Sequence, residues 1–194
     1  MAGARPARER ASAAERRAGL SERRERRAAE TDPEVVLAAA LRFLESRPRS
    51  VREVRRRLDQ AGFPMPLIQA AIDRLEELGM LDDEAFARSW VESRDRARPR
   101  GERALRSELA LKGVAREVVD RILADRRPES DTSADEAAAE RLLAGRARSL
   151  ERITDPRVRR QRAYALLARN GFDPDVAARV SRTMASAADE AADA

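Results

Sequence analysis

Three short segments of this 194-residue chain share one pattern: a leucine stands four residues before a glycine, and an apolar residue follows the glycine. These segments are Leu58 to Phe63, Leu109 to Val114 and Leu167 to Phe172. A glycine directly after an apolar helical stripe is typical of a left-handed helix C-cap, because glycine adopts positive φ without steric cost. We therefore expect Gly62, Gly113 and Gly171 to end three equivalent helices. Spacings of 51 and 58 residues between these glycines indicate a degenerate repeat with an insertion.

Helix start signals in the rest of the chain agree with the repeat that the glycines indicate. Asp32-Pro33, Asp155-Pro156 and Asp173-Pro174 each read as an N-cap followed by the first helical residue, and capping boxes begin at Ser50 and Ser133. We expect an all-α fold of tandem three-helix repeats that form an elongated, curved helical array. The predicted segments are a disordered Arg-rich tail at 1–30, three-helix repeats at 31–80, 81–125 and 135–185, a linker at 126–134 and a frayed acidic tail at 186–194.

Apolar residues at helical spacing predict the core of each repeat. In the first repeat they form three stripes: Leu37, Ala40, Leu41 and Leu44; Val51, Val54, Leu58 and Ala61; and Ile68, Ala71, Ile72, Leu75 and Leu78. In the second repeat we expect helices near 84–97, 101–112 and 115–125.

The segment from Leu81 to Arg94 contains the only tryptophan of a chain in which aromatic residues make up 3%. Asp82 or Asp83 can cap the helix that starts there, since carboxylates accept hydrogen bonds from its free amides. Phe86 and Trp90 then lie one helical turn apart. We interpret this segment as a cap followed by core, with Trp90 inside, in preference to a chemical site.

The residue types that most reactive sites need are missing. The chain has no cysteine and no histidine, which removes the commonest metal ligands and general base. Its glycines do not form a phosphate-binding loop. A carboxylate metal site at Asp82, Asp83 and Glu84 is conceivable, but a helix N-terminus explains these acids. We expect no catalytic, cofactor-binding or metal-binding residues, and no enzyme.

The sequence contains no apolar run long enough to span a bilayer, and we expect no secretory signal peptide. We expect a monomer in the bacterial cytoplasm, with no membrane association. Residues 1–30 carry nine arginines and five acidic residues, a balance of +4 out of +5 for the chain. Two interpretations of this tail stay open: a non-specific nucleic-acid arm and a solubilising extension.

The first repeat also permits a helix-turn-helix interpretation, because Arg52 and Arg56 share an exposed face before Gly62. The following helix would then enter the major groove of DNA. However, that helix presents mainly the acidic and amide side chains of Asp73, Glu76, Glu77 and Gln69, with Arg74 as its only basic residue. Sequence-specific DNA binding is therefore disfavoured.

The order and spacing of several motifs resemble the RecX family of bacterial RecA regulators. The resemblance runs from about Val35 to Leu123 and more loosely through 135–184. Its motifs are Leu44 to Ser50, Gly62, Leu78 to Asp83, Phe86-Ala87, Val91, Arg94, Gly101 and Leu109 to Gly113. The long Arg-rich N-terminus and the third repeat depart from the general pattern of that family.

This resemblance implies a non-catalytic protein that binds RecA, lodges in the groove of its filament on DNA and restrains its ATPase, strand-exchange and co-protease activities. Such a protein acts in recombination, DNA repair and the SOS response. We expect residues 34–184 to recognise RecA and the tail to add non-specific DNA affinity. Candidate partner-binding residues are Arg52, Arg56, Arg57, Arg96, Arg103 and Arg106. Residues assigned to structural motifs are Gly62, Asp82, Asp83, Phe86, Trp90, Arg94, Gly101, Gly113 and Gly171. The alternative is a general helical DNA-binding module that uses the tail and the helix surfaces.

Overall fold

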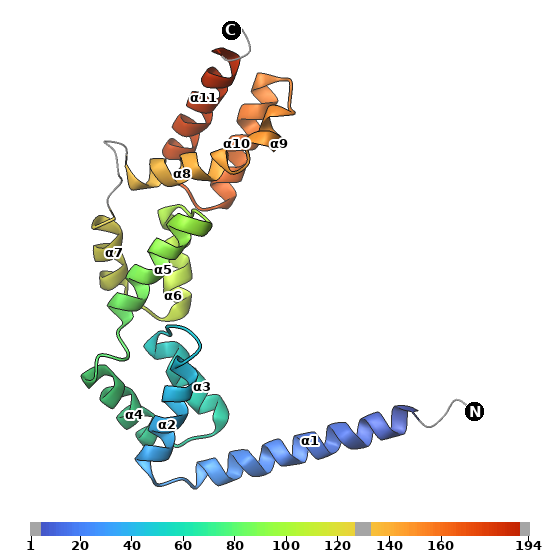
Figure 1. Cartoon of the computed structure of the whole chain (residues 1–194), viewed down its shortest axis with the longest axis vertical. Helices are drawn as coiled ribbons and strands as arrows, with labels where there is room; N and C mark the ends of the chain where they lie inside the picture. Colours follow the sequence, from blue (N-terminus) through green and yellow to red (C-terminus); the bar gives the residue numbers. More distant parts are fainter. Residues whose placement is uncertain (1–4, 127–132, 191–194) are drawn as a thin grey trace. The chain divides into compact units, whose positions relative to one another are not determined.

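The computed structural model describes residues 5–126 and 133–190, and all regular elements within these ranges are helices (Figure 1). The predicted all-α class is confirmed. The helices belong to two units, residues 1–82 and 83–194. Small parts of three predicted segments lie outside the described residues: 1–4 of the tail, 127–132 of the linker and 191–194 of the acidic end.

The first unit contains α1 (Arg5–Ala28), α2 (Pro33–Leu44), α3 (Val51–Ala61) and α4 (Met65–Glu77). Helices α2, α3 and α4 share one core, made of Val36, Ala40, Val54, Leu58, Phe63, Ile68, Ala71, Ile72, Leu75 and Leu81. Of the stripe predicted for α2, Ala40 is fully buried and Leu37, Leu41 and Leu44 are partly buried against the core, while Val36, which was not predicted, is also fully buried. Leu78 was expected in the core and is 49% exposed, because α4 has already ended at Glu77.

Residues 5–28, which lie in the segment predicted to be a disordered tail, form helix α1. Alanine, arginine and glutamate dominate this segment, and all three are strong helix formers. The last turn of α1 contacts the three-helix bundle: the Arg27 guanidinium lies 5.2 Å from the centre of the Phe63 ring, and its Nη1 donates to the Ala61 carbonyl at 3.5 Å. The C-terminal end of α1 is thus attached to the first bundle.

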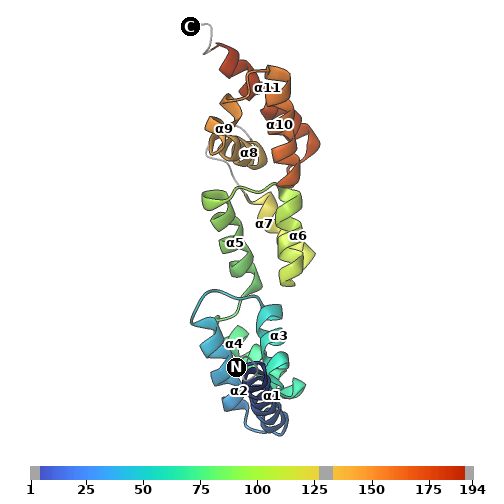
Figure 2. The ribbon, with the colours of Figure 1, turned by 90° about the vertical axis from the view of Figure 1, so that its right-hand side faces the viewer.

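The second unit contains two bundles (Figure 2). One consists of α5 (Asp83–Ala97), α6 (Glu102–Lys112) and α7 (Arg116–Ala124), close to the predicted ranges. The other consists of α8 (Ala134–Ala144), α9 (Ala147–Glu151), α10 (Pro156–Arg169) and α11 (Pro174–Glu190). The five-residue helix α9 was not expected from the sequence. Each bundle has its own core, centred on Leu105 and Leu109 in the first and on Ala163 and Leu167 in the second.

The repeated Leu-to-Gly pattern has the same structure in all three bundles. Gly62, Gly113 and Gly171 have φ of 95°, 85° and 80°, as predicted. The amide of the apolar residue after each glycine donates to the carbonyl of the repeated leucine, in the pairs Phe63 to Leu58 (3.3 Å), Val114 to Leu109 (3.1 Å) and Phe172 to Leu167 (3.3 Å). This is the Schellman motif, in which the closing hydrogen bond accompanies an apolar contact. The same turn therefore ends a core helix in each bundle.

Candidate interaction surfaces and the joint between two bundles

The first set of candidate arginines lies on α3. Arg52 and Arg56 are exposed, and the Arg57 guanidinium lies 5.8 Å from the centre of the Phe43 ring. Arg49, which precedes the helix, lies closer to the same ring at 4.1 Å. A cation over an aromatic face is attracted by its quadrupole, which restrains both side chains. Arg56 is therefore better placed than Arg57 to reach a partner.

The helix that would enter DNA in the helix-turn-helix interpretation is α4. Its exposed residues include Asp73, Glu76 and Glu77, and its arginine, Arg74, pairs with Glu77 at 3.0 Å. A phosphate backbone would meet net negative charge on this face. The structure thus gives the same physical reason as the sequence for disfavouring a major-groove reader.

The second set of candidates spans α5 and α6. Arg96 and Arg103 are exposed, and among the described residues neither forms an ion pair. Arg106 differs, because it pairs with Glu102 at 2.8 Å and with Asp120 of α7 at 3.1 Å. Burial lowers the pKa of Arg106, but hydrogen bonds to Asp120 and Glu102 outweigh it, so this pKa is raised above its ordinary value. Arg106 thus links α6 to α7, and Arg96 and Arg103 are the better probes of a partner.

Trp90 lies at the edge of the core and not inside it, which corrects the prediction. Phe86 and Val91 are buried, whereas the partly buried Trp90 ring sits 5.9 Å from Phe86, tilted by 32°. Its indole N–H donates to Glu108 Oε2 at 2.8 Å, and the Arg94 guanidinium lies 4.6 Å above the ring. An indole needs a hydrogen-bond partner, which favours a position where its nitrogen reaches a polar group. The ring thereby connects α5 to α6.

Gly101 and Gly171 allow a close approach between the two bundles of the second unit. The Gly101 amide donates to the Asn170 carbonyl at 3.1 Å. A Cβ on Gly101 would lie 2.3 Å from the Gly171 carbonyl oxygen. A Cβ on Gly171 would lie 2.5 Å from the Ala104 Cβ. Neither position has room for a side chain. The start of α6 is therefore in backbone contact with the turn between α10 and α11.

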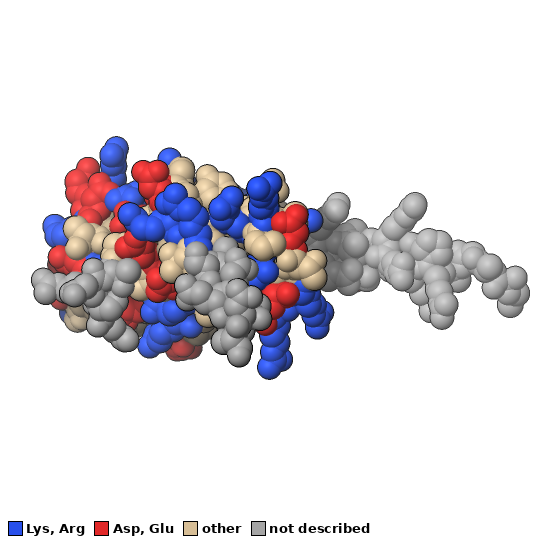
Figure 3. All heavy atoms as spheres, turned by 90° about the horizontal axis from the view of Figure 1, so that it is seen from above, with Lys and Arg blue, Asp and Glu red and all other residues tan. Residues whose placement is uncertain are grey.

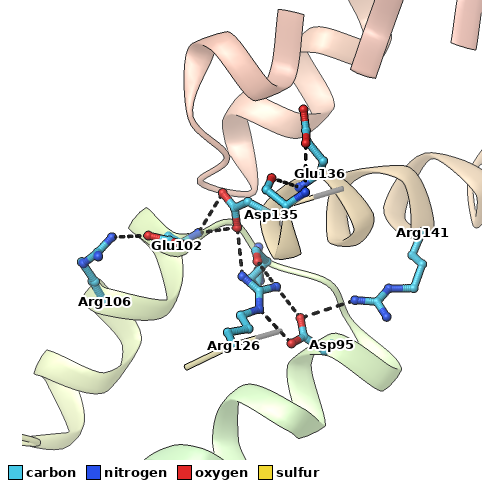
Figure 4. Close-up of polar contacts among 9 residues, drawn as sticks. Asp95, Glu102, Arg106, Arg126, Asp135, Glu136 and Arg141 are labelled. Carbon is cyan, nitrogen blue, oxygen red and sulfur yellow. Dashed lines mark hydrogen bonds and ion pairs between the residues drawn. The ribbon is translucent and has the colours of Figure 1, made fainter. Parts of the chain in front are cut away.

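A polar joint, defined by Asp95, Arg126 and Asp135, ties the same two bundles together (Figure 4). Arg126 donates to Asp95 through Nε at 2.9 Å and Nη2 at 2.5 Å, and to Asp135 through Nη1 at 2.9 Å. Asp135 also accepts from the backbone amide of Glu102 at 3.1 Å. The Arg126 side chain is only 5% exposed. The guanidinium therefore joins α5 to α8, and the Asp135 carboxylate joins α8 to the start of α6.

Burial and ion pairing have opposite effects on the pKa values of the residues in this joint. Burial acts to lower the pKa of Arg126, but Asp95 and Asp135 outweigh it and raise that pKa. Burial also raises the pKa of Asp135 above its ordinary value, against the opposing influence of Arg126. A buried carboxylate stays charged only while a cation compensates its lost hydration. The ionised joint thus depends on Arg126.

Sequence reasoning missed this joint, because it placed Arg126 in a linker. The partners Asp95 and Asp135 lie 31 and nine residues away along the chain, and no local pattern connects them. Asp135 was noticed only as part of the capping box that begins at Ser133, which the structure does contain.

Charged side chains of both signs are present on the face that Figure 3 shows. Figure 3 shows arginine side chains standing out in several groups, with acidic side chains between them. Within the described residues, no group of three or more acidic side chains is arranged to hold a metal ion. A helix both long and apolar enough to traverse a bilayer is likewise missing from the part of the chain that the structure describes.

Two family models match the first two of the three predicted repeats. Residues 37–75 match the first three-helix domain of RecX, and residues 82–123 match the second. Both matches fall on the bundles formed by α2–α4 and α5–α7.

Curated relatives and solved structures extend the similarity further. The "Regulatory protein RecX" of Mycobacterium sp. (strain JLS) is 39% identical over 144 residues, covering 72% of this chain and 76% of the relative. That of Streptomyces coelicolor is 35% identical over 152 residues, covering 78% of each. The crystal structure of RecX from Lactobacillus salivarius superposes with a TM-score of 0.66 at 20% identity, covering 78% of this chain and 95% of that structure. That last likeness supports the fold.

Proposed function

Because the chain belongs to the RecX family of regulatory proteins, we propose that it binds the RecA filament on DNA and inhibits its ATPase, strand-exchange and co-protease activities. The family is one of regulators and not of enzymes. The observation that carries the proposal is the family membership, which extends over about three quarters of the chain. The RecA partner and the direction of the effect come from the resemblance described above.

Exposed arginines support the proposal. Arg56, Arg96 and Arg103 extend from helix surfaces, and the described residues give none of them an ion-pair partner. A guanidinium that already forms an ion pair gains little binding energy from a new carboxylate or phosphate. A solvated guanidinium can form charge-assisted hydrogen bonds with either group. These three residues are our candidates for contact with the filament.

The polar joint supports the proposal in a second way. It holds the α5–α7 bundle to the α8–α11 bundle through Arg126, so that their surfaces face a partner in a fixed relation. Fixing surfaces before binding lowers the entropy lost on association.

The test follows ATP hydrolysis by RecA on filaments assembled on single-stranded DNA before this protein is added. We expect hydrolysis to fall with increasing protein. Arg96→Glu with Arg103→Glu should weaken this inhibition, whereas the control Arg146→Glu with Arg148→Glu should retain it. Arg146 and Arg148 are also exposed, and the control makes the same change in charge because it too replaces two arginines by glutamates.

Unchanged hydrolysis at a large excess of folded protein would reject the RecA proposal. If the protein then bound DNA without RecA as tightly as it bound the filament, the general DNA-binding module would be the better account.

A further inference from the structure

Positive charge is not confined to the N-terminal tail. Residues 135–185 contain eleven arginines and seven acidic residues, whereas residues 31–80 and residues 81–125 each contain equal numbers of basic and acidic residues. Helix α10 has five arginines and no acidic residue. Residues 186–194 contain three acidic residues, which offset most of the positive charge of residues 135–185 when net charge is summed over everything after residue 30.

Part of this charge lines a groove between α10 and α11, which pack side by side in both ribbon views (Figures 1 and 2). The groove has a volume of about 410 Å³. Its lining includes Arg157, Arg160 and Tyr164 from α10, and Ala178, Ser181 and Arg182 from α11. Both sets follow helical spacing, so each occupies one face of its helix.

The groove combines cationic and aromatic groups with no acidic side chain among its described lining residues. Arg157 and Arg160 are exposed, and within the described residues neither has an ion-pair partner. Tyr164, the only tyrosine of the chain, is 38% exposed. Ala178 and Ser181, which are small, line the α11 side of the groove. The Ser181 hydroxyl donates to the Ala178 carbonyl at 3.2 Å, so it makes no polar demand on a ligand.

We propose that this α10–α11 groove binds single-stranded nucleic acid, with phosphodiester groups at Arg157 and Arg160 and one base stacked on Tyr164. Sites for single strands pair a basic track with aromatic platforms, because every base has a face that can stack. A duplex offers no unstacked base to the Tyr164 ring, and an acidic peptide has no base that could stack on that ring. The volume lies within the range of about 300–1,000 Å³ found for small-ligand pockets, enough for a nucleotide-sized group.

This site adds a DNA contact to the proposed function, but its test contains no RecA, so failure of one is distinguishable from failure of the other. The probe is a fluorescent oligothymidylate, titrated with the full chain at several salt concentrations while anisotropy is recorded. A second oligonucleotide of equal length with abasic sites removes stacking and keeps the phosphates. Circular dichroism and thermal melting check that each variant is folded.

Two kinds of variant separate charge from stacking. Arg157→Ala with Arg160→Ala should lower affinity and reduce the slope of log affinity against log salt by about 1.4, since each phosphate contact on a single strand contributes roughly 0.7. Tyr164→Ala should weaken binding of oligothymidylate on the order of 10-fold with little change in slope, as expected for loss of one stacked base. It should bind the abasic oligonucleotide as the wild type does, and Tyr164→Phe should restore stacking.

The matched control is Arg146→Ala with Arg148→Ala, which removes the same charge from the same bundle outside the groove. An equal loss of affinity and slope in this control would mean that only general electrostatic attraction is present, and the site would be rejected. Wild-type binding by Tyr164→Ala would also reject it. A polyglutamate peptide that displaces the oligonucleotide, and that loses its own affinity with Arg157→Ala and Arg160→Ala but not with Tyr164→Ala, would indicate a protein ligand instead.

Discussion

The Arg126 guanidinium lies between Asp95 of α5 and Asp135 of α8, with 5% of its side chain exposed. Removing one partner of a buried ion pair is strongly destabilising, because the other charge remains buried without compensation. Replacement of Arg126 should therefore expose what the joint contributes to the second unit.

We expect Arg126→Met to destabilise the protein by about 3–5 kcal/mol, measured as the free energy of unfolding in urea. The defect should shrink as pH falls. The pKa of Asp135 is already raised by burial and should rise further without Arg126. A carboxyl with a folded pKa above its unfolded value contributes stability at low pH that is lost as pH rises through the folded pKa.

Arg141 provides the control, since it approaches Asp95 only at 3.8 Å and its side chain is 51% exposed. Arg141→Met should change stability by less than about 0.5 kcal/mol. Similar losses for the two variants would show that the joint is not a compensated buried charge.

At the residue scale, the sequence located apolar positions better than polar partnerships. Phe86 was correctly placed in the core because helical spacing predicts burial. Trp90, one turn later, was placed too deep because spacing carries no information on where its N–H finds Glu108. Arg126 was missed because its partners are joined to it only by the tertiary fold.

Helix ends are the element-scale feature that recurs in every bundle. Gly79 and Gly171 both have positive φ, yet their surroundings differ, since nothing lies within 4 Å of a Cβ built on Gly79 whereas a Cβ on Gly171 would lie 2.5 Å from the Ala104 Cβ. Gly79→Ala should cost about 1–2 kcal/mol from the backbone conformation alone. Gly171→Ala should cost about 1–3 kcal/mol more, because the start of α6 must also move.

Thermal melting of the two variants tests this pair. An equal decrease in melting temperature would mean that α6 and the α10–α11 turn are not in contact in solution.

The capping box of α8 makes a prediction about pH. A hydrogen bond with the Ser133 amide, together with Arg179, holds the pKa of Glu136 below its ordinary value. A carboxyl with a depressed folded pKa stabilises the fold above its unfolded pKa, about 4.3, and that stability is lost as pH falls through the folded value. Glu136→Gln should therefore be less stable than the wild type near neutral pH, with a difference that vanishes in acid.

Urea unfolding at a series of pH values measures this difference, and Glu140→Gln, an exposed position on the same helix, is the control. A gap between Glu136→Gln and the wild type that stays constant from neutral pH to acid would contradict a role for the charge.

Element boundaries were largely readable from the sequence because caps are local. Ser50 and Glu53 form the predicted capping box, and the three glycine turns lie where the leucine spacing placed them. Helix α9 was not predicted, since five residues without a cap signal give little periodicity. The absence of acidic residues from α10 can be read from the sequence, but the net charge summed over all residues after 30 does not reveal it.

At the scale of the whole molecule, charge is divided between the N-terminal segment and the α8–α11 bundle. Deleting residues 1–20 removes five arginines and two acids and keeps Arg27 on Phe63. This deletion should flatten the salt dependence of DNA binding, by roughly one unit of slope for each duplex phosphate that the segment no longer neutralises. Inhibition of RecA should survive when the protein is in excess.

Fluorescence anisotropy on duplex DNA across salt concentrations measures the slope, and the RecA ATPase assay measures inhibition. An unchanged slope would favour the solubilising interpretation of this segment, and loss of RecA inhibition would contradict the division of roles.

RecA recognition is tested by comparing binding of the full chain to RecA filaments and to the same single-stranded DNA without RecA, at matched salt. We expect tighter binding to the filament, which should persist at salt concentrations that release the protein from bare DNA, because salt screens phosphate contacts more than a specific protein interface. Equal affinity for the two, abolished at the same salt concentration, would contradict RecA recognition.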